Sequence, residues 1–180
     1  LKPNDMVICA DGGALYAFAL GVTPHVIVGD MDSLPVDVQS QVTEQDIEII
    51  HHPVKKDKTD LELALSVAAD RGAAEILLLS ALGGRLDQLL ANLLLLTRPE
   101  WRHIRFHIAD GRQHGWLMRG RDTLCLRGVV GDTLSIIPLS QSVNGLDIEG
   151  VEWPLTNQTV LMGDTLTISN TFLGAEATIR

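Results

Sequence analysis

The hydrophobic rhythm of this chain changes near residue 110, and that change limits the possible folds more than any other feature. Before it, apolar runs alternate with segments of helical period. The runs are 6–10, 26–28, 47–50, 75–79 and 104–108, and the helical segments are 14–20, 36–43, 59–71 and 86–96. Nearly continuous aliphatic runs are typical of strands buried on both faces of a parallel sheet. Residues 1–109 are therefore predicted to form an α/β domain with right-handed crossovers.

After Asp110-Gly111 the helical period disappears and a two-residue alternation replaces it. Three segments, 122–126, 131–136 and 163–168, each begin with a turn pair and continue with this alternation. The pattern is typical of antiparallel strands with one buried face. The predicted fold class is thus an N-terminal parallel-sheet α/β domain, followed over residues 110–180 by a C-terminal all-β sandwich domain.

Charge and composition exclude several classes of protein. Fourteen basic against 23 acidic residues give a net charge of −9, which argues against a nucleic-acid or anionic-membrane partner. The longest apolar stretch, 86–96, is too short to span a bilayer, and no signal peptide is visible. Cys9 and Cys125 lie in apolar runs, which predicts buried thiols rather than a disulfide framework. We therefore expect a soluble, cytoplasmic protein.

Acidic residues, glycines and cations follow four of the predicted strands. They occupy residues 11–13, 29–33, 55–60 and 83–87. Ligands of open α/β sheets bind outside the carboxyl ends of the strands, so we expect these four loops to meet at one edge. A Walker-A pattern and a serine nucleophile elbow do not occur in the sequence. The coincidence of the four loops, rather than any single one, predicts a site.

The aspartates of these loops favour a metal site. Asp30 and Asp32 are two residues apart, so both carboxylates point the same way in extended backbone, and Asp11 and Asp60 could join them. Clustered carboxylates repel one another unless a cation lies between them. A few oxygen ligands with room left for phosphate suit Mg²⁺. Each aspartate alone could equally form a turn or a helix cap, but the whole set favours the metal.

Two predicted helix starts are suited to phosphate. Thr59 and Glu62 have the spacing of a capping box, which explains both without a catalytic role, and the neighbouring lysines make this helix start a plausible phosphate site. Gly83-Gly84-Arg85 would let backbone approach a ligand and would offer a guanidinium for bidentate contact. Asp87 could orient Arg85, contact the metal, or be a plain surface charge.

The histidines give weaker signals. His51-His52 lacks a zinc-type spacing and is interpreted as a solvated loop, while His107 and His114 look isolated in the sequence. From the residues alone, the chain is predicted to be a Mg²⁺-dependent enzyme that handles phosphate and uses a nucleotide.

Six ordered motifs resemble the thiamine pyrophosphokinase family. They are residues 11–14, 24–33, 56–65, 83–87 with Asn92, 151–155 and 168–171. The resemblance implies an α/β domain joined to a β-sandwich in a homodimer. It also implies transfer of the pyrophosphoryl group of ATP to the hydroxyl of thiamine, with Mg²⁺, giving thiamine diphosphate and AMP.

The resemblance further implies roles for individual residues. Catalytic roles fall on Asp30, Asp32, Asp60 and Arg85, and the three aspartates are also the implied metal ligands. The implied ATP-binding residues are Asp11, Lys56, Asp57, Gly83, Gly84, Arg85 and Asp87. The implied thiamine-binding residues are Trp153, Ser169 and Asn170.

The chain departs from the family pattern in places. It begins one strand later than is usual and ends before the customary last strand, so we expect a fragment. Gln88 stands where many relatives carry His, and no acid–base role is assigned to it. Two alternatives remain open: a Mg²⁺-dependent nucleotide pyrophosphohydrolase, in which water replaces the alcohol, and a non-catalytic sensor of a phosphorylated ligand.

Overall fold

The computed structural model describes the chain except for residues 1, 3, 31–34, 36–41, 44 and 54–56. It consists of two compact units, Leu1–Trp116 and Leu117–Arg180. The division falls later than the predicted 109/110 boundary because strand β6 (Gln113–Trp116) pairs antiparallel with β5 (Arg105–Asp110). This hairpin belongs to the first unit.

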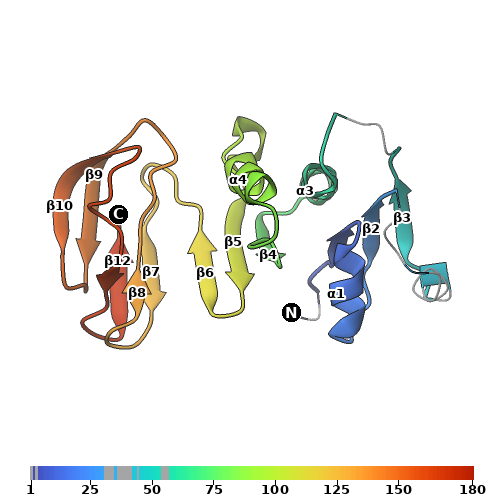
Figure 1. Ribbon diagram of the computed structural model, residues 1–180, viewed down its shortest axis with the longest axis horizontal. Coiled ribbons are helices and arrows are strands. Elements are labelled where there is room, and N and C mark those ends of the chain that lie inside the picture. Colours follow the sequence, from blue (N-terminus) through green and yellow to red (C-terminus); the bar gives the residue numbers. More distant parts are fainter. Residues whose placement is uncertain (1, 3, 31–34, 36–41, 44, 54–56) are drawn as a thin grey trace. The chain divides into compact units, whose positions relative to one another are not determined.

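A parallel sheet of order β1-β2-β3 opens the first unit, with strands β1 (Ile8–Ala10), β2 (Val26–Gly29) and β3 (Glu48–His51) (Figure 1). Helix α1 (Gly13–Ala19) and helix α3 (Asp60–Asp70) cover its two faces. Ile27 packs in one cluster with Ala14 of α1, whereas Val26 and Val28 pack with Leu63 and Ala64 of α3. Strand β2 is therefore buried on both faces, as its apolar run predicts.

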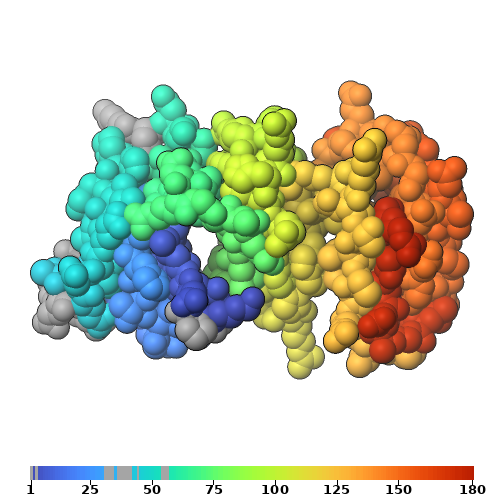
Figure 2. All heavy atoms as spheres, turned by 180° about the vertical axis from the view of Figure 1, so that it is seen from behind, coloured from blue at the N-terminus to red at the C-terminus, as the bar shows by residue number. Residues whose placement is uncertain are grey.

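The second sheet of this unit has the order β4-β5-β6, with β4 (Glu75–Leu79) parallel to β5. Helix α4 (Leu86–Leu95) and a 3₁₀ turn (Pro99–Trp101) lie between β4 and β5 in the chain. In Figure 2 a hollow separates the blue N-terminal part of this unit from its green part. Among the described residues, the α/β unit thus has two three-stranded sheets, β1-β2-β3 and β4-β5-β6.

Strand β4 does not follow the prediction of burial on both faces. Leu78 is buried, but Leu77 and Leu79 are 46% and 54% exposed. One face of the sheet holds Leu78 together with buried Phe106 and Ile108, while the described residues leave the other face open. The apolar run therefore predicted the strand correctly, but it did not predict that one face of the strand is exposed.

The second unit is entirely β, as predicted. A four-stranded antiparallel sheet has the order β10-β9-β12-β7, and β11 pairs with β8 in a second sheet. The strands are β7 (Leu124–Arg127), β8 (Thr133–Leu134), β9 (Ser142–Glu149), β10 (Leu155–Leu161), β11 (Asn170–Thr171) and β12 (Glu176–Ile179). Both sheets contribute to one core, in which Ile148, Val160 and Ala177 are buried with Phe172.

Two local predictions in this half are wrong. Residues 163–168 form turns rather than a strand, because only Thr167 points inward, and it exchanges two hydrogen bonds with Ile136. Cys125 is exposed, while Cys9 of the first unit is 6% exposed and its burial raises the pKa of its thiol to about 11.

The predicted helix over 36–43 lies almost wholly outside the described residues.

No helix in the described part of the chain combines the length and apolar character that crossing a bilayer requires.

Candidate functional site

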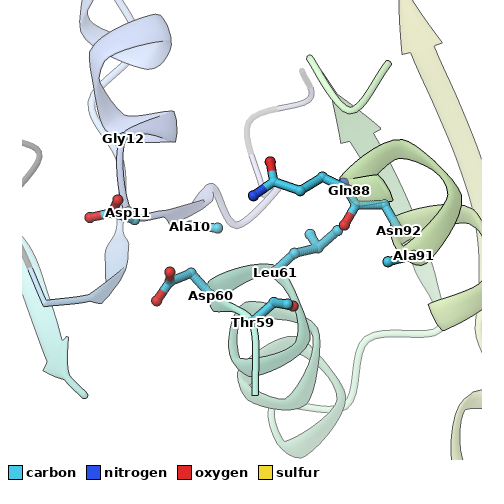
Figure 3. A pocket seen from close by; sticks show the side chains of 9 residues that line it. All are labelled: Ala10, Asp11, Gly12, Thr59, Asp60, Leu61, Gln88, Ala91 and Asn92. Atoms are coloured by element: carbon cyan, nitrogen blue, oxygen red, sulfur yellow. The ribbon is translucent and has the colours of Figure 1, made fainter. Parts of the chain in front are cut away.

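A pocket of about 340 Å³ opens in the first unit, where β1 ends and α3 begins. Three segments line it: the end of β1, the start of α3 and one side of α4. Figure 3 shows Asp11 and Asp60 on one side of the pocket and Gln88 and Asn92 of α4 across from them. The complete lining is Ala10, Asp11, Gly12, Thr59, Asp60, Leu61, Gln88, Ala91 and Asn92.

Asp11 directly follows β1 in a left-handed backbone conformation, with φ of 41°. Its N–H donates to the Val28 carbonyl at 2.8 Å, and its own carbonyl accepts from Ala14 N–H at 3.1 Å. The side-chain Oδ1 is buried and has no hydrogen-bond partner among the described residues. A buried oxygen of this kind is costly unless a donor or a cation reaches it, so it points to a ligand.

Gly29 gives Asp11 the space for this position. A Cβ added to Gly29 would lie 3.1 Å from the Asp11 Cβ and 3.2 Å from Oδ1. Both distances are tighter than ordinary van der Waals contact. Any side chain at position 29 would therefore press on the Asp11 carboxylate.

Asp60 is the first residue of α3, and Thr59 caps the helix by accepting a hydrogen bond from Glu62 N–H at 3.2 Å. The other half of the predicted capping box is not used, because the Glu62 carboxylate lies 2.7 Å from Arg98 and 3.6 Å from Lys58. The free N–H groups and dipole of a helix N-terminus attract anions. This end of α3 therefore combines a carboxylate with an anion-binding backbone.

Asp30 follows β2 at the same sheet edge as Asp11, since the register pairs Ala10 with Val28. Asp32 and Lys56 lie outside the described residues. Within the described ranges, no three His, Cys, Asp or Glu side chains are arranged to hold a metal ion. The structure thus brings Asp11 and Asp60 into one pocket and Asp30 to the neighbouring strand end.

Arg85 and Asp87 form an ion pair at the start of α4. Arg85 Nε donates to Asp87 Oδ1 at 3.1 Å and Nη2 donates to Oδ2 at 2.5 Å. The pair raises the pKa of Arg85 and lowers the pKa of Asp87. Both side chains are well exposed, and neither lines the pocket. This geometry is compatible with two of the interpretations left open for Asp87, orientation of Arg85 and a plain surface charge.

The loop before Arg85 is anchored by a residue distant in the sequence, Asp110. Leu82 N–H donates to the Asp110 carboxylate at 3.2 Å, and Gly83 and Gly84 follow with φ of 106° and 70°. Glycine is the residue that adopts such angles at low cost. Asp57, by contrast, is exposed and is not among the lining residues.

In the second unit, Asn170 is buried and holds the backbone at Trp153. Its Oδ1 accepts from Trp153 N–H at 3.1 Å, and its Nδ2 donates to the Trp153 carbonyl at 2.8 Å. The Trp153 ring is 56% exposed. Ser169 is also exposed, has φ of 61°, and donates its N–H to Ser135 Oγ. The Asn170 amide thus holds the Trp153 backbone in place.

The α4 side of the pocket was not predicted from the sequence. Gln88 and Asn92 are four residues apart and lie on one helix face, with Ala91 beside them. This spacing was the available signal. The spacing does not show that these residues line the pocket, however, because the sequence does not say which face of α4 turns toward β1.

Comparison with known proteins decides the family. Residues 1–108 match the model of the thiamin pyrophosphokinase catalytic domain, and residues 123–180 match that of the thiamin pyrophosphokinase vitamin B1 binding domain. The chain belongs to the thiamin pyrophosphokinase family. The resemblance found in the sequence motifs is thereby confirmed.

Relatives in this family match almost the whole chain. A thiamine pyrophosphokinase of Bacillus subtilis is 27% identical over 171 residues, which are 95% of this chain and 80% of that protein. A thiamine pyrophosphokinase of Oryza sativa subsp. japonica is 26% identical over 197 residues, covering 96% and 73%. The crystal structure of the Bacillus subtilis protein has a TM-score of 0.87 at 26% identity, covering 99% of this chain and 84% of that chain. Thiamin pyrophosphokinase from Geobacillus thermodenitrificans has a TM-score of 0.70 at 28% identity, covering 99% and 82%.

Proposed function

We propose that this chain transfers the pyrophosphoryl group of ATP to the hydroxyl of thiamine, giving thiamine diphosphate and AMP. The observation that carries the proposal is the succession of both thiamin pyrophosphokinase domains along one chain. In this reaction the thiamine oxygen forms a bond to the β-phosphorus. The bond from that phosphorus to the oxygen it shares with the α-phosphate breaks, and AMP keeps this oxygen.

The proposed metal is Mg²⁺, and the residues present fit it. Mg²⁺ prefers a few carboxylate oxygens and keeps several waters, which matches aspartates at the ends of adjacent strands. The buried Asp11 Oδ1 without a partner supports this fit, because such an oxygen calls for a positive neighbour. Asp30, Asp32 and Asp60 would hold the ion. The chemistry it supplies is neutralisation of charge on the phosphate oxygens.

The chain's own groups supply the remaining roles. The N-terminus of α3 binds phosphate oxygens through its N–H groups, and one carboxylate among Asp11 and the metal-site aspartates takes the proton of the thiamine hydroxyl. Arg85, already oriented by Asp87, presents a planar fork to phosphate. Lys56, Asp57, Gly83 and Gly84 complete the proposed ATP site.

The acceptor site is proposed at Trp153, Ser169 and Asn170. The exposed Trp153 ring supports this, because an aromatic face attracts the positive thiazolium of thiamine. We further propose that the protein acts as a homodimer in the cytoplasm.

Product analysis tests the proposed function. Purified protein with ATP and Mg²⁺ should release AMP only when thiamine is present, together with an equal amount of thiamine diphosphate. Release of AMP at the same rate without thiamine would instead establish the nucleotide pyrophosphohydrolase. Binding of nucleotide with no product in either case would indicate the sensor.

A further inference from the structure

His107 and His114, which look isolated in the sequence, lie side by side on the β5–β6 hairpin. Their Nε2 and Nδ1 atoms are 3.1 Å apart, and their ring centroids are 5.3 Å apart. The hairpin register explains the contact, since it pairs His107 with Trp116 and His114 with Ala109. The two histidines are diagonal neighbours on one face of an antiparallel pair, within reach of each other.

The Trp116 ring fixes the His107 ring in place. The two rings stack at 4.6 Å between centroids with 8° between their planes, and His114 lies 5.9 Å from the Trp116 centroid. Trp116 is 40% exposed and His114 is exposed, so solvent reaches the pair. The His107 ring is therefore held in place, both rings are accessible, and their facing nitrogens point toward each other.

The spacing of the facing nitrogens fits a shared metal ion. Two nitrogens 3.1 Å apart subtend an angle of roughly 100° at an ion that lies about 2.0–2.1 Å from each. This angle suits tetrahedral and octahedral coordination alike. In the neutral pair one facing nitrogen carries a proton that the other accepts. Coordination needs that proton on the opposite nitrogen of the same ring, and it needs both rings to turn so that their lone pairs meet at the ion.

We propose that His107 and His114 form a two-ligand site for a transition-metal ion of the Zn²⁺ or Cu²⁺ class. Imidazole nitrogen suits these ions, whereas Mg²⁺ takes oxygen ligands, so the site is chemically distinct from the proposed ATP site. Among the described residues no third His, Cys, Asp or Glu completes the set, and water fills the remaining positions. Glu75 on β4 shares this face but is paired with Arg105 at 3.5 Å.

The test is metal titration of the full chain, prepared without a histidine tag and treated with chelator. Calorimetry with Zn²⁺ should give one ion per chain, and Cu²⁺ should quench the fluorescence of Trp116, which lies against the ligands. His114→Gln should weaken binding by about tenfold or more, since even supporting groups around a metal change affinity on that scale. Millimolar Mg²⁺ should not compete.

His103→Gln is the matched control, because His103 is also exposed and in the first unit but lies outside the pair. It should leave Zn²⁺ affinity unchanged. His114→Gln is preferred to His107→Gln because it leaves the His107–Trp116 stack in place, and circular dichroism checks its fold. Zn²⁺ affinity equal in wild type and His114→Gln, displacement by Mg²⁺, or no binding at millimolar Zn²⁺ would each overturn the proposal.

Discussion

At the scale of single residues, the geometry around Asp11 connects the sheet to the pocket. Its backbone lies in the left-handed region, its Oδ1 is buried without a described partner, and Gly29 stands against it. Each feature is unfavourable or restrictive for an ordinary surface aspartate. Together they indicate a carboxylate held in place for a ligand.

Gly29→Ala tests whether the position of the Asp11 carboxylate matters for activity. The added methyl would approach the Asp11 carboxylate to 3.1–3.2 Å and push it out of position, and displacements of about 1 Å can cost 100-fold in rate. We expect kcat/KM for ATP to fall by about 10- to 100-fold. Gly120→Ala, where a methyl would meet open space, is the control. If kcat/KM of Gly29→Ala were unchanged, Asp11 would not be part of the active site.

Asp60→Asn tests the proposed metal site. Loss of one carboxylate should lower kcat by about 100-fold or more and raise the Mg²⁺ concentration needed for half-maximal rate. The control is Asp70→Asn at the other end of the same helix, where an exposed acid opposes the helix dipole. Rates measured across a Mg²⁺ series separate the two variants. If Asp60→Asn kept normal turnover and normal Mg²⁺ dependence, Asp60 would not be a metal ligand.

Arg85→Lys tests the phosphate fork. A lysine is a point charge and cannot reproduce the two parallel contacts of a guanidinium, so we expect a loss of roughly 10- to 1000-fold in kcat/KM. Arg127→Lys provides the comparison, because Arg127 is also exposed and paired with an acid, Glu176. The measurement is steady-state kinetics of both variants. If Arg85→Lys had a normal kcat/KM, Arg85 would be a surface residue that does not bind phosphate.

At the scale of elements, β1, β2 and α3 were predictable because their burial follows directly from local pattern. The β4 and 163–168 segments show the limit of this reasoning. The two-residue alternation of residues 163–168 neither showed that the polar Thr167 faces inward nor distinguished a strand from a turn, and an apolar run could not say whether both faces of β4 are covered. The His107–His114 pair depends on hairpin register, which no single segment specifies.

Asn170→Ala tests the link between β11 and the Trp153 loop. The variant leaves the backbone N–H and carbonyl of Trp153 without their partner, so the free energy of unfolding should fall by about 1–3 kcal/mol. The KM for thiamine should rise while that for ATP stays nearly unchanged, because Trp153 loses its support.

Asn144→Ala serves as the control, since Asn144 is an exposed asparagine of the same unit. Denaturant unfolding and the two KM values are the measurements. If the KM values for thiamine and ATP changed equally, or if neither changed, Trp153 and Asn170 would not be part of the thiamine site.

At the scale of the whole molecule, the change of rhythm near residue 110 predicted two units of different class, and the structure has an α/β unit followed by an all-β unit. The candidate site was predictable in part: Asp11 and Asp60 do line one pocket. Gln88 and Asn92 were not, because the face of α4 that turns toward β1 is set by tertiary packing. The function itself required the ordered motifs of both units.

In the proposed reaction the whole pyrophosphoryl group moves in one step from ATP to thiamine. The most direct test uses ATP labelled in its β-phosphate, with thiamine, Mg²⁺ and the purified protein. One-step transfer should give labelled thiamine diphosphate and an equal amount of unlabelled AMP. Labelled ADP with thiamine monophosphate, or labelled inorganic pyrophosphate without thiamine diphosphate, would contradict it.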